Sequence, residues 1–325
     1  MIRATSNALY LLTSIVVLTT AALPLAHGQS PDEGLVLFLR FDEGVGGTVA
    51  DYSLYGNDGT VYEATWTSGY SGYGLDFDGQ DDYVVVADSP SLHIASDVSV
   101  EAWVNKRGTA NNNILIKYEP GCTPYFWLSV GDAARFQVRN SDGVLRNVDS
   151  SSGLADNGWH HVVGVRDVVT GTIAVYVDGY LHEEGSDPGG SIENGKVVKI
   201  GKYYGGSELP FDGGIDEVRL YNRALAAEEI EAHWLGLVGH WRLDSASGTV
   251  AYDSSGHGND GTISGPTWAS GVSGTALDFH GGDDYVVINE SPSLSIAADV
   301  TVAAWVSKRG PETNNVVVKY EPGST

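Results

Sequence analysis

Cysteine, methionine and basic residues are scarce in this sequence. Cys122 is the only cysteine among 325 residues, so no disulfide can form within the chain. Lys and Arg number 18 against 42 acidic residues, and the net charge of -24 repels phosphate backbones and anionic membranes. After residue 28, no apolar run is long enough to span a membrane. These features exclude a disulfide scaffold and a later membrane span, and they argue against nucleic acid as a partner.

Glycine, in contrast, is abundant, and the apolar content is that of a folded protein. The chain has 42 glycines and one methionine, a balance typical of turn-rich β architecture rather than of helices. Apolar residues make up 42% of the chain and charged residues 18%, which leaves enough apolar surface for a core. A length of 325 residues predicts two folded units rather than one.

Residues 1–28 have the features of a secretory signal peptide. Arg3 begins a short, weakly positive segment, the apolar run LYLLTSIVVLTTAALPLA follows, and a small-x-small site ends at Gly28. We therefore expect cleavage near residue 28 and a secreted protein, extracellular or at the cell surface. An uncleaved anchor is the alternative.

The chain contains a tandem duplication. Residues 35–123 align without a gap with residues 237–325 at an offset of 202, and 50 of the 89 positions are identical. Because this period is the size of a domain, each copy is expected to fold largely by itself. The sequence thus predicts a first domain over residues 31–235 and a partial second domain over residues 236–325.

The pattern within the first copy is strand, turn, strand. Apolar residues alternate with other residues in two predicted strands, at Val98, Val100, Ala102 and Val104 and at Ile173, Val175 and Val177. Asp142-Gly143 and Asp178-Gly179 are typical hairpin turns, and residues 223–234 have helix-forming composition. This predicts an all-β fold, a two-sheet antiparallel jelly-roll sandwich with one short C-terminal helix per repeat.

Three stretches carry a family resemblance. They are GWHHVVGVRDVVTGTIAVYVDG at 158–179, VVKIG at 197–201 and FDGGIDEVRLYNRALAAEEI at 211–230. Together they resemble the LamG-like jelly-roll domains of the concanavalin A-like lectin and glucanase superfamily. The resemblance implies the fold, but not one function, because lectins, adhesion modules, calcium-dependent binders and a few enzymes share it.

The acidic residues do not form the pattern of a glycan-cleaving enzyme. Members that cleave glycans resemble one another in a strand with three alternating acids, which places both catalytic carboxylates on one face. Here Asp216 and Glu217 are adjacent, as are Asp81 and Asp82, and adjacent residues of a regular strand point to opposite faces. The sequence therefore predicts a non-catalytic protein.

A repeated acidic loop is the candidate calcium site. DYSLYGNDGT at 51–60 matches DSSGHGNDGT in the second copy, and both contain side-chain oxygens of the kind that Ca2+ prefers. We predict Asp51, Asn57, Asp58 and Asp216 as ligands. The alternative is an Asx-type turn, in which Asp and Asn bond their own backbone.

Two further acids lie in LDFDGQDDYVVV, and the second copy has a similar stretch, LDFHGGDDYVVI. Asp81 and Asp82 are predicted to cap the turn between two strands, with a metal site as the alternative. Asp78 is replaced by His280 in the second copy, so chemistry shared by both copies cannot depend on it.

Aromatic residues are the candidate sugar-binding groups. Tyr125 and Trp127 share one face of a predicted strand, and Tyr203 and Tyr204 lie in a glycine-flanked loop. Sugars bury a C–H face on aromatic rings while amides bond their hydroxyls, a role that Asn112 is expected to fill. Packing in the fold is the alternative for the four aromatics.

These observations predict an exported, non-catalytic carbohydrate-binding or adhesion module, repeated for avidity. Its partner is expected to be a polysaccharide or glycan, or a cell-surface protein. The alternatives are a structural or protein-binding ectodomain and an accessory module of a longer glycan-active enzyme.

Overall fold

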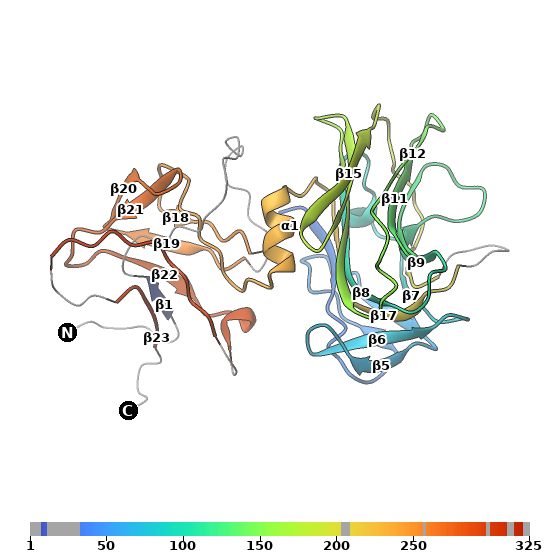
Figure 1. Ribbon diagram of the computed structural model, residues 1–325, viewed down its shortest axis with the longest axis horizontal. Helices are drawn as coiled ribbons and strands as arrows, with labels where there is room; N and C mark the ends of the chain where they lie inside the picture. Colours follow the sequence, from blue (N-terminus) through green and yellow to red (C-terminus); the bar gives the residue numbers. More distant parts are fainter. Residues whose placement is uncertain are drawn as a thin grey trace. The chain divides into compact units, whose positions relative to one another are not determined.

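The computed structural model describes residues 8–11, 33–202, 209–255, 258–296, 300–310 and 315–320. The chain divides into two compact units (Figure 1). The complete unit is Gly34–Trp234, and the partial unit combines Leu235–Thr325 with residues from the N-terminus. None of the described helices is long and apolar enough to cross a membrane.

The complete unit consists of two antiparallel sheets. In spatial order, the back sheet contains β15 (Tyr180–Ser186), β14 (Thr172–Val177), β13 (Trp159–Asp167), β8 (Val98–Lys106), β17 (Asp212–Tyr221), β6 (Tyr73–Asp78) and β5 (Thr65–Ser68), and β2 (Leu35–Leu39) also pairs with β17. The front sheet contains β12 (Leu145–Asp149), β11 (Ala134–Arg139), β10 (Tyr125–Val130), β9 (Asn112–Lys117), β16 (Val198–Ile200), β7 (Tyr83–Val86), β4 (Gly59–Tyr62) and β3 (Thr48–Val49). This confirms the predicted jelly-roll sandwich.

The core lies between the two sheets, where alternate residues of each strand meet. The predicted alternation of β8 is confirmed, since its inward side chains are fully or almost fully buried: Val98, Val100, Ala102 and Val104. The front sheet contributes alternate residues of β10 to the same core, namely Phe126, Leu128 and Val130.

One helix covers the outer face of the back sheet. Helix α1 spans Ala227–Trp234 and buries Ile230 in a second apolar cluster with residues of β13 and β17. It begins four residues later than the predicted helix. Glu229 accepts a hydrogen bond from the N–H of Ala226 and pairs with Arg223, which fixes the first turn. The outer face of β8 is therefore buried as well.

Both predicted hairpin turns are present. The Asp142-Gly143 turn joins β11 to β12, and the Asp178-Gly179 turn joins β14 to β15. Asp178 and Gly179 have φ values of 51° and 81°, the left-handed conformation that a two-residue hairpin turn requires.

The partial unit repeats the early strands of the complete unit. Its sheet contains β18 (Val250–Ala251), β19 (Gly261–Ser264), β22 (Tyr285–Asn289), β1 (Ala8–Leu11) and β23 (Val317–Tyr320), and β20 (Thr267–Ser270) pairs with β21 (Thr275–Asp278). Short 3-10 helices at Pro90–Leu92 and Pro292–Leu294 also correspond.

Strand β1 takes the place that β16 has in the complete unit. Leu9 lies opposite Ile288 and Tyr10 opposite Val287, as Val198 and Lys199 lie opposite the corresponding residues of β7. On its other side, β1 pairs with β23. The residues of β1 fall within residues 1–28, the predicted signal peptide. Cleavage of that segment remains a prediction.

Candidate functional site

A stacked aromatic pair lies on the outer face of the front sheet. Tyr125 and Trp127 alternate with the core residues of β10, so their rings point away from the core. The ring centroids are 5.3 Å apart, and the ring planes differ by 11°. Tyr118 meets the Tyr125 ring edge-on at 4.9 Å. Tyr125 is buried, whereas Trp127 keeps part of its surface exposed.

Two amide side chains extend this aromatic pair across the sheet. Gln137 lies directly opposite Trp127, and its amide donates a hydrogen bond to the Tyr125 hydroxyl at 3.3 Å. Asn147 lies opposite Gln137 on the next strand and is exposed. We call Tyr125, Trp127, Gln137 and Asn147 the aromatic–amide row. The predicted sugar site did not include the two amides, although the Asp142-Gly143 hairpin fixes their register.

The structure does not bring Asn112 to this row. A bulge in β9 places Asn112 opposite Val130, which points into the core, and not on the face of Trp127. Asn112 is 6% exposed and lines a pocket of about 650 Å3 together with Asp78 and Lys106. Among the described residues, its Oδ1 has no hydrogen-bond partner.

Tyr203 and Tyr204, the other two predicted sugar-binding aromatics, lie outside the described residues.

In the loop predicted to hold calcium, hydrogen-bond donors surround Asp51. Its Oδ1 accepts from the N–H groups of Phe38 and Ser53, at 2.8 and 2.9 Å. Its Oδ2 accepts from the Ser53 hydroxyl at 2.6 Å and the Asn57 N–H at 2.7 Å. Asp253 accepts the four equivalent bonds in the partial unit. This geometry favours the Asx-type loop over a calcium site.

The other three predicted calcium ligands have partners of their own. Asn57 donates from its amide to a backbone carbonyl of β2 at 2.7 Å, and Asp58 accepts the N–H of Asp51 at 2.9 Å. Asp216 lies in the back sheet, where it accepts the N–H of Ser71 at 3.0 Å. None of these contacts joins Asp216 to the loop.

Asp216 and Glu217 reach the same side of the back sheet, so the prediction that they point to opposite faces is wrong. A bulge in β17 follows Asp216, and Glu217 has a left-handed φ of 51°. The Glu217 carboxylate pairs with Arg219 at 2.6 Å and lies 3.6 Å from Arg40. The pKa of Asp216 is raised to about 8, and burial of the carboxyl group is the largest cause. Asp216 is thus buried and protonated at neutral pH, while Glu217 is buried in an ion pair with Arg219.

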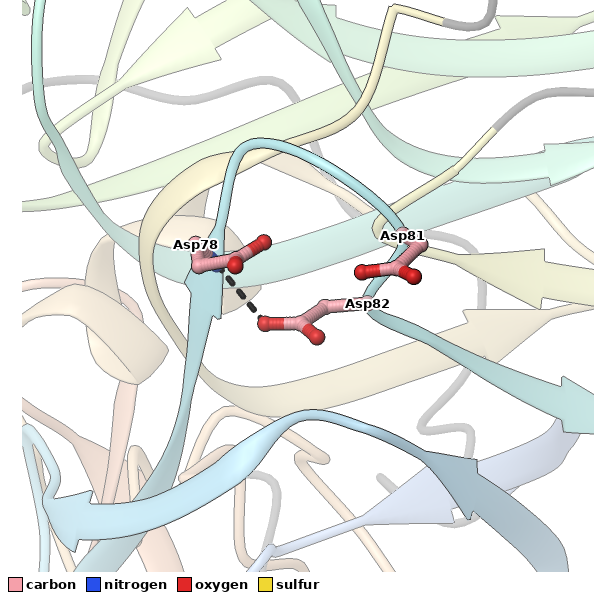
Figure 2. A group of neighbouring side chains, drawn as sticks. All are labelled: Asp78, Asp81 and Asp82. Atoms are coloured by element: carbon pink, nitrogen blue, oxygen red, sulfur yellow. Dashed lines mark hydrogen bonds between the residues drawn. The ribbon is translucent and has the colours of Figure 1, made fainter.

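Three acids converge at the turn after β6, as Figure 2 shows for Asp78, Asp81 and Asp82. Within the described part of the chain, no other group of three acidic or imidazole side chains has its oxygens and nitrogens so close, within 4.8 Å. Asp82 accepts the N–H of Asp78 at 2.7 Å, as a turn-capping residue does. In the partial unit, His280 replaces Asp78 and lies 3.4 Å from Asp284, so both units do not share a three-carboxylate group.

Residues 78–231 match a family model described as the concanavalin A-like lectin/glucanases superfamily. The match covers most of the complete unit, from β6 into α1. The match runs from the acidic turn into α1 and includes both the aromatic–amide row and the β17 bulge. No curated protein sequence matches the chain significantly.

Solved structures with a similar fold include binding domains of botulinum neurotoxins and of a mosquitocidal protein. The binding domain of Paraclostridial Mosquitocidal Protein 1 aligns with 63% of this chain and 52% of its own, at 14% identity and a TM-score of 0.53. The botulinum neurotoxin serotype D binding domain aligns with 64% of this chain and 52% of its own, at 15% identity and a TM-score of 0.52. The serotype G binding domain aligns with 76% of this chain and 65% of its own, at 12% identity and a TM-score of 0.53. The chain thus spans about half the length of the first two, and the likeness shows the fold alone.

The hydrogen bonds of Asp51 generate a first prediction. Asp51→Asn leaves two donors facing an amide N–H2 group, so we expect it to lower the free energy of unfolding by about 2 kcal/mol. The loss should be equal in chelator and in millimolar calcium, as measured by chemical denaturation. Asp142→Asn, in an exposed hairpin turn, is the matched control and should change little. A loss that appears only with calcium would show that Asp51 is a metal ligand.

Asp216 generates a second prediction, for pH. Its pKa in the folded state, about 8, lies above the ordinary value of 3.8, so the folded protein holds this proton more tightly. The contribution to stability is complete below pH 4 and is lost as the pH rises towards 8, by up to about 1.4 kcal/mol per pH unit. Asp216→Asn removes this dependence.

Chemical denaturation at pH 5, 6.5 and 8 therefore should show wild type losing stability relative to Asp216→Asn as the pH rises. The substitution also weakens a backbone hydrogen bond, but that loss is the same at every pH. Parallel stability profiles for the two proteins would contradict a buried, protonated Asp216.

Proposed function

We propose that the chain is an exported, non-catalytic carbohydrate-binding or adhesion protein whose complete unit holds the glycan. The aromatic–amide row carries this proposal. A partly exposed indole is stacked on a buried tyrosine, and the exposed Asn147 lies in the same row beyond the buried Gln137. The indole covers the apolar C–H face of a sugar, Gln137 holds the Tyr125 hydroxyl, and the Asn147 amide donates to and accepts from the hydroxyl groups of the sugar.

The fold and the sequence support this proposal in different ways. The superfamily and the similar toxin binding domains make a binding module the expected class. The net charge of -24 disfavours nucleic acid and anionic membranes as ligands. Export rests on the signal-peptide pattern of residues 1–28. Calcium binding is tested separately by Asp51→Asn, and the proposal for the row does not need calcium.

A structural or protein-binding ectodomain is the second candidate. Exposed apolar side chains away from the row favour it, for example Leu54 at 94% and Leu181 at 50%. Exposed leucines contact another protein more readily than a sugar. An accessory module of a longer glycan-active enzyme is compatible with the same row.

The row generates a third prediction. Trp127→Ala removes the indole platform, and truncation of an anchoring tryptophan costs about 2 kcal/mol of binding free energy. We therefore expect a roughly 30-fold weaker affinity for the glycans that wild type retains. Binding to a glycan array, with and without chelator, followed by titration of the best ligand, measures the change.

Tyr55→Ala is the matched control, because Tyr55 is an exposed aromatic residue in a loop outside the row. It should bind as wild type does. Melting curves of both variants check that each still folds. Wild type that binds no glycan, while binding a cell-surface protein, would favour the ectodomain instead.

A further inference from the structure

The charged side chains around the aromatic–amide row are mostly basic, although the chain as a whole is acidic. On β10, β11 and β12, the strands of the row, the charged side chains that alternate with the core residues are Arg135, Arg139 and Asp149. In the whole chain, 42 acidic residues outnumber 18 basic ones. The charge of this face therefore differs in sign from that of the protein.

A carboxylate neutralises one of the two arginines. Arg135 pairs with Asp149, which lies directly opposite on β12, through hydrogen bonds of 2.6 and 3.1 Å. Arg139 forms no ion pair within the described part of the chain, and its Nε donates a hydrogen bond to the Gly143 carbonyl at 3.2 Å. This bond fixes the base of the guanidinium group, while the terminal nitrogens Nη1 and Nη2 have no acceptor among the described residues. Arg139 thus keeps its positive charge and two sets of N–H donors for a ligand.

Arg139 lies beside the stacked rings. It is directly opposite Tyr125 on β10 and two residues from Gln137 along β11, a separation of about 7 Å. Trp127 is its diagonal neighbour on β10 at a similar distance, which long side chains span. A sugar ring stacked on the indole therefore places its own substituents, or those of the adjoining sugar, beside the guanidinium group.

A guanidinium group in this position favours carboxylates among the substituents of sugars. Its planar set of N–H donors matches the two oxygens of a carboxylate, and the charges make these hydrogen bonds stronger than those to a hydroxyl group. A neutral sugar offers no such partner. At physiological salt, exposed charges more than about 8 Å apart are largely screened, so the distant acids of the chain oppose an acidic ligand only weakly.

We propose that the glycan of the aromatic–amide row is an acidic oligosaccharide, with a uronic acid stacked on or next to Trp127 and its carboxylate held by Arg139. The inference rests on the proposed function and adds to it the chemical class of the ligand.

The test compares uronic-acid oligosaccharides with their methyl esters, which have the same sugar rings without the charge. Galacturonate, glucuronate and mannuronate oligosaccharides are placed on one array beside their three esters and a set of neutral glycans. Titration calorimetry with the full chain then measures the best acid and its ester. We expect wild type to bind that acid about tenfold or more tightly than the ester, because hydrogen bonds to charged groups contribute that much.

Arg139→Gln removes the charge and keeps a polar side chain at this position. It should bind the acid about tenfold more weakly than wild type and the ester equally well. Arg139→Lys, which keeps the charge but not the planar set of donors, should retain part of the preference.

Arg146→Gln is the matched control, because it makes the same charge change in the same hairpin. Arg146 lies opposite Val138, on the side of β12 away from the row, and it bonds the backbone carbonyls of Leu145 and Ser186. It should keep the wild-type preference for the acid, and melting curves check that each variant folds.

The outcomes separate this inference from the proposed function. Wild type that binds esters or neutral glycans as tightly as acids, and loses them in Trp127→Ala, would overturn the acidic class and leave the row as a glycan site. An undiminished preference for the acid in Arg139→Gln would also overturn it. Wild type that binds nothing on the array contradicts the proposed function as well.

Discussion

The pairing of β8 between β13 and β17 is the interaction on which the complete unit depends. It makes β8 a central strand of the back sheet, and eight of its nine residues are buried. Its inward side chains fill the core. Its outward side carries Glu101, which is fully buried and is stable there because Arg219 and His233 bond it. His233 belongs to α1, so the same carboxylate helps to hold the helix on the sheet.

The division of labour between the two sheets follows from this arrangement. The central strands of the back sheet are covered by the core on one face and by α1 on the other, and their acids Glu101 and Glu217 form internal ion pairs with Arg219. The front sheet keeps a face with a partly exposed indole and polar side chains. On the front sheet, the partly exposed Trp127 of β10 and the exposed Asn147 of β12 therefore face solvent, on either side of the buried Gln137 of β11.

Regular structure was predictable from the sequence, because alternation and turn chemistry are local. The core side of β8, both hairpins and the jelly-roll class were all predicted and are confirmed. Tyr125 and Trp127 were placed on one face for the same reason. The position of Gln137 opposite Asn147 could also have been predicted, because a hairpin turn fixes the register of the strands that it joins.

Bulges mark where sequence reasoning failed. One extra residue in β9 turns Asn112 away from the face of Trp127, and the bulge in β17 brings Glu217 to the side of Asp216. Neither bulge has a local signal such as glycine in the left-handed position, and Glu217 adopts it as a non-glycine residue. Its carboxylate pairs with Arg219, two residues along β17, and lies near Arg40, which is distant in the chain. The contact with Arg40 appears only once the sheet has formed.

The central claim, that the complete unit holds a glycan on the aromatic–amide row, is tested most directly by the indole N–H resonance of Trp127. Its NMR signal can be assigned in the full chain by its loss in Trp127→Phe and followed during titration with neutral and acidic oligosaccharides. The account predicts that a bound oligosaccharide shifts the Trp127 signal and leaves the signal of Trp66, on the back sheet, in place. Binding that leaves Trp127 unshifted, or the absence of binding by every oligosaccharide, would contradict it.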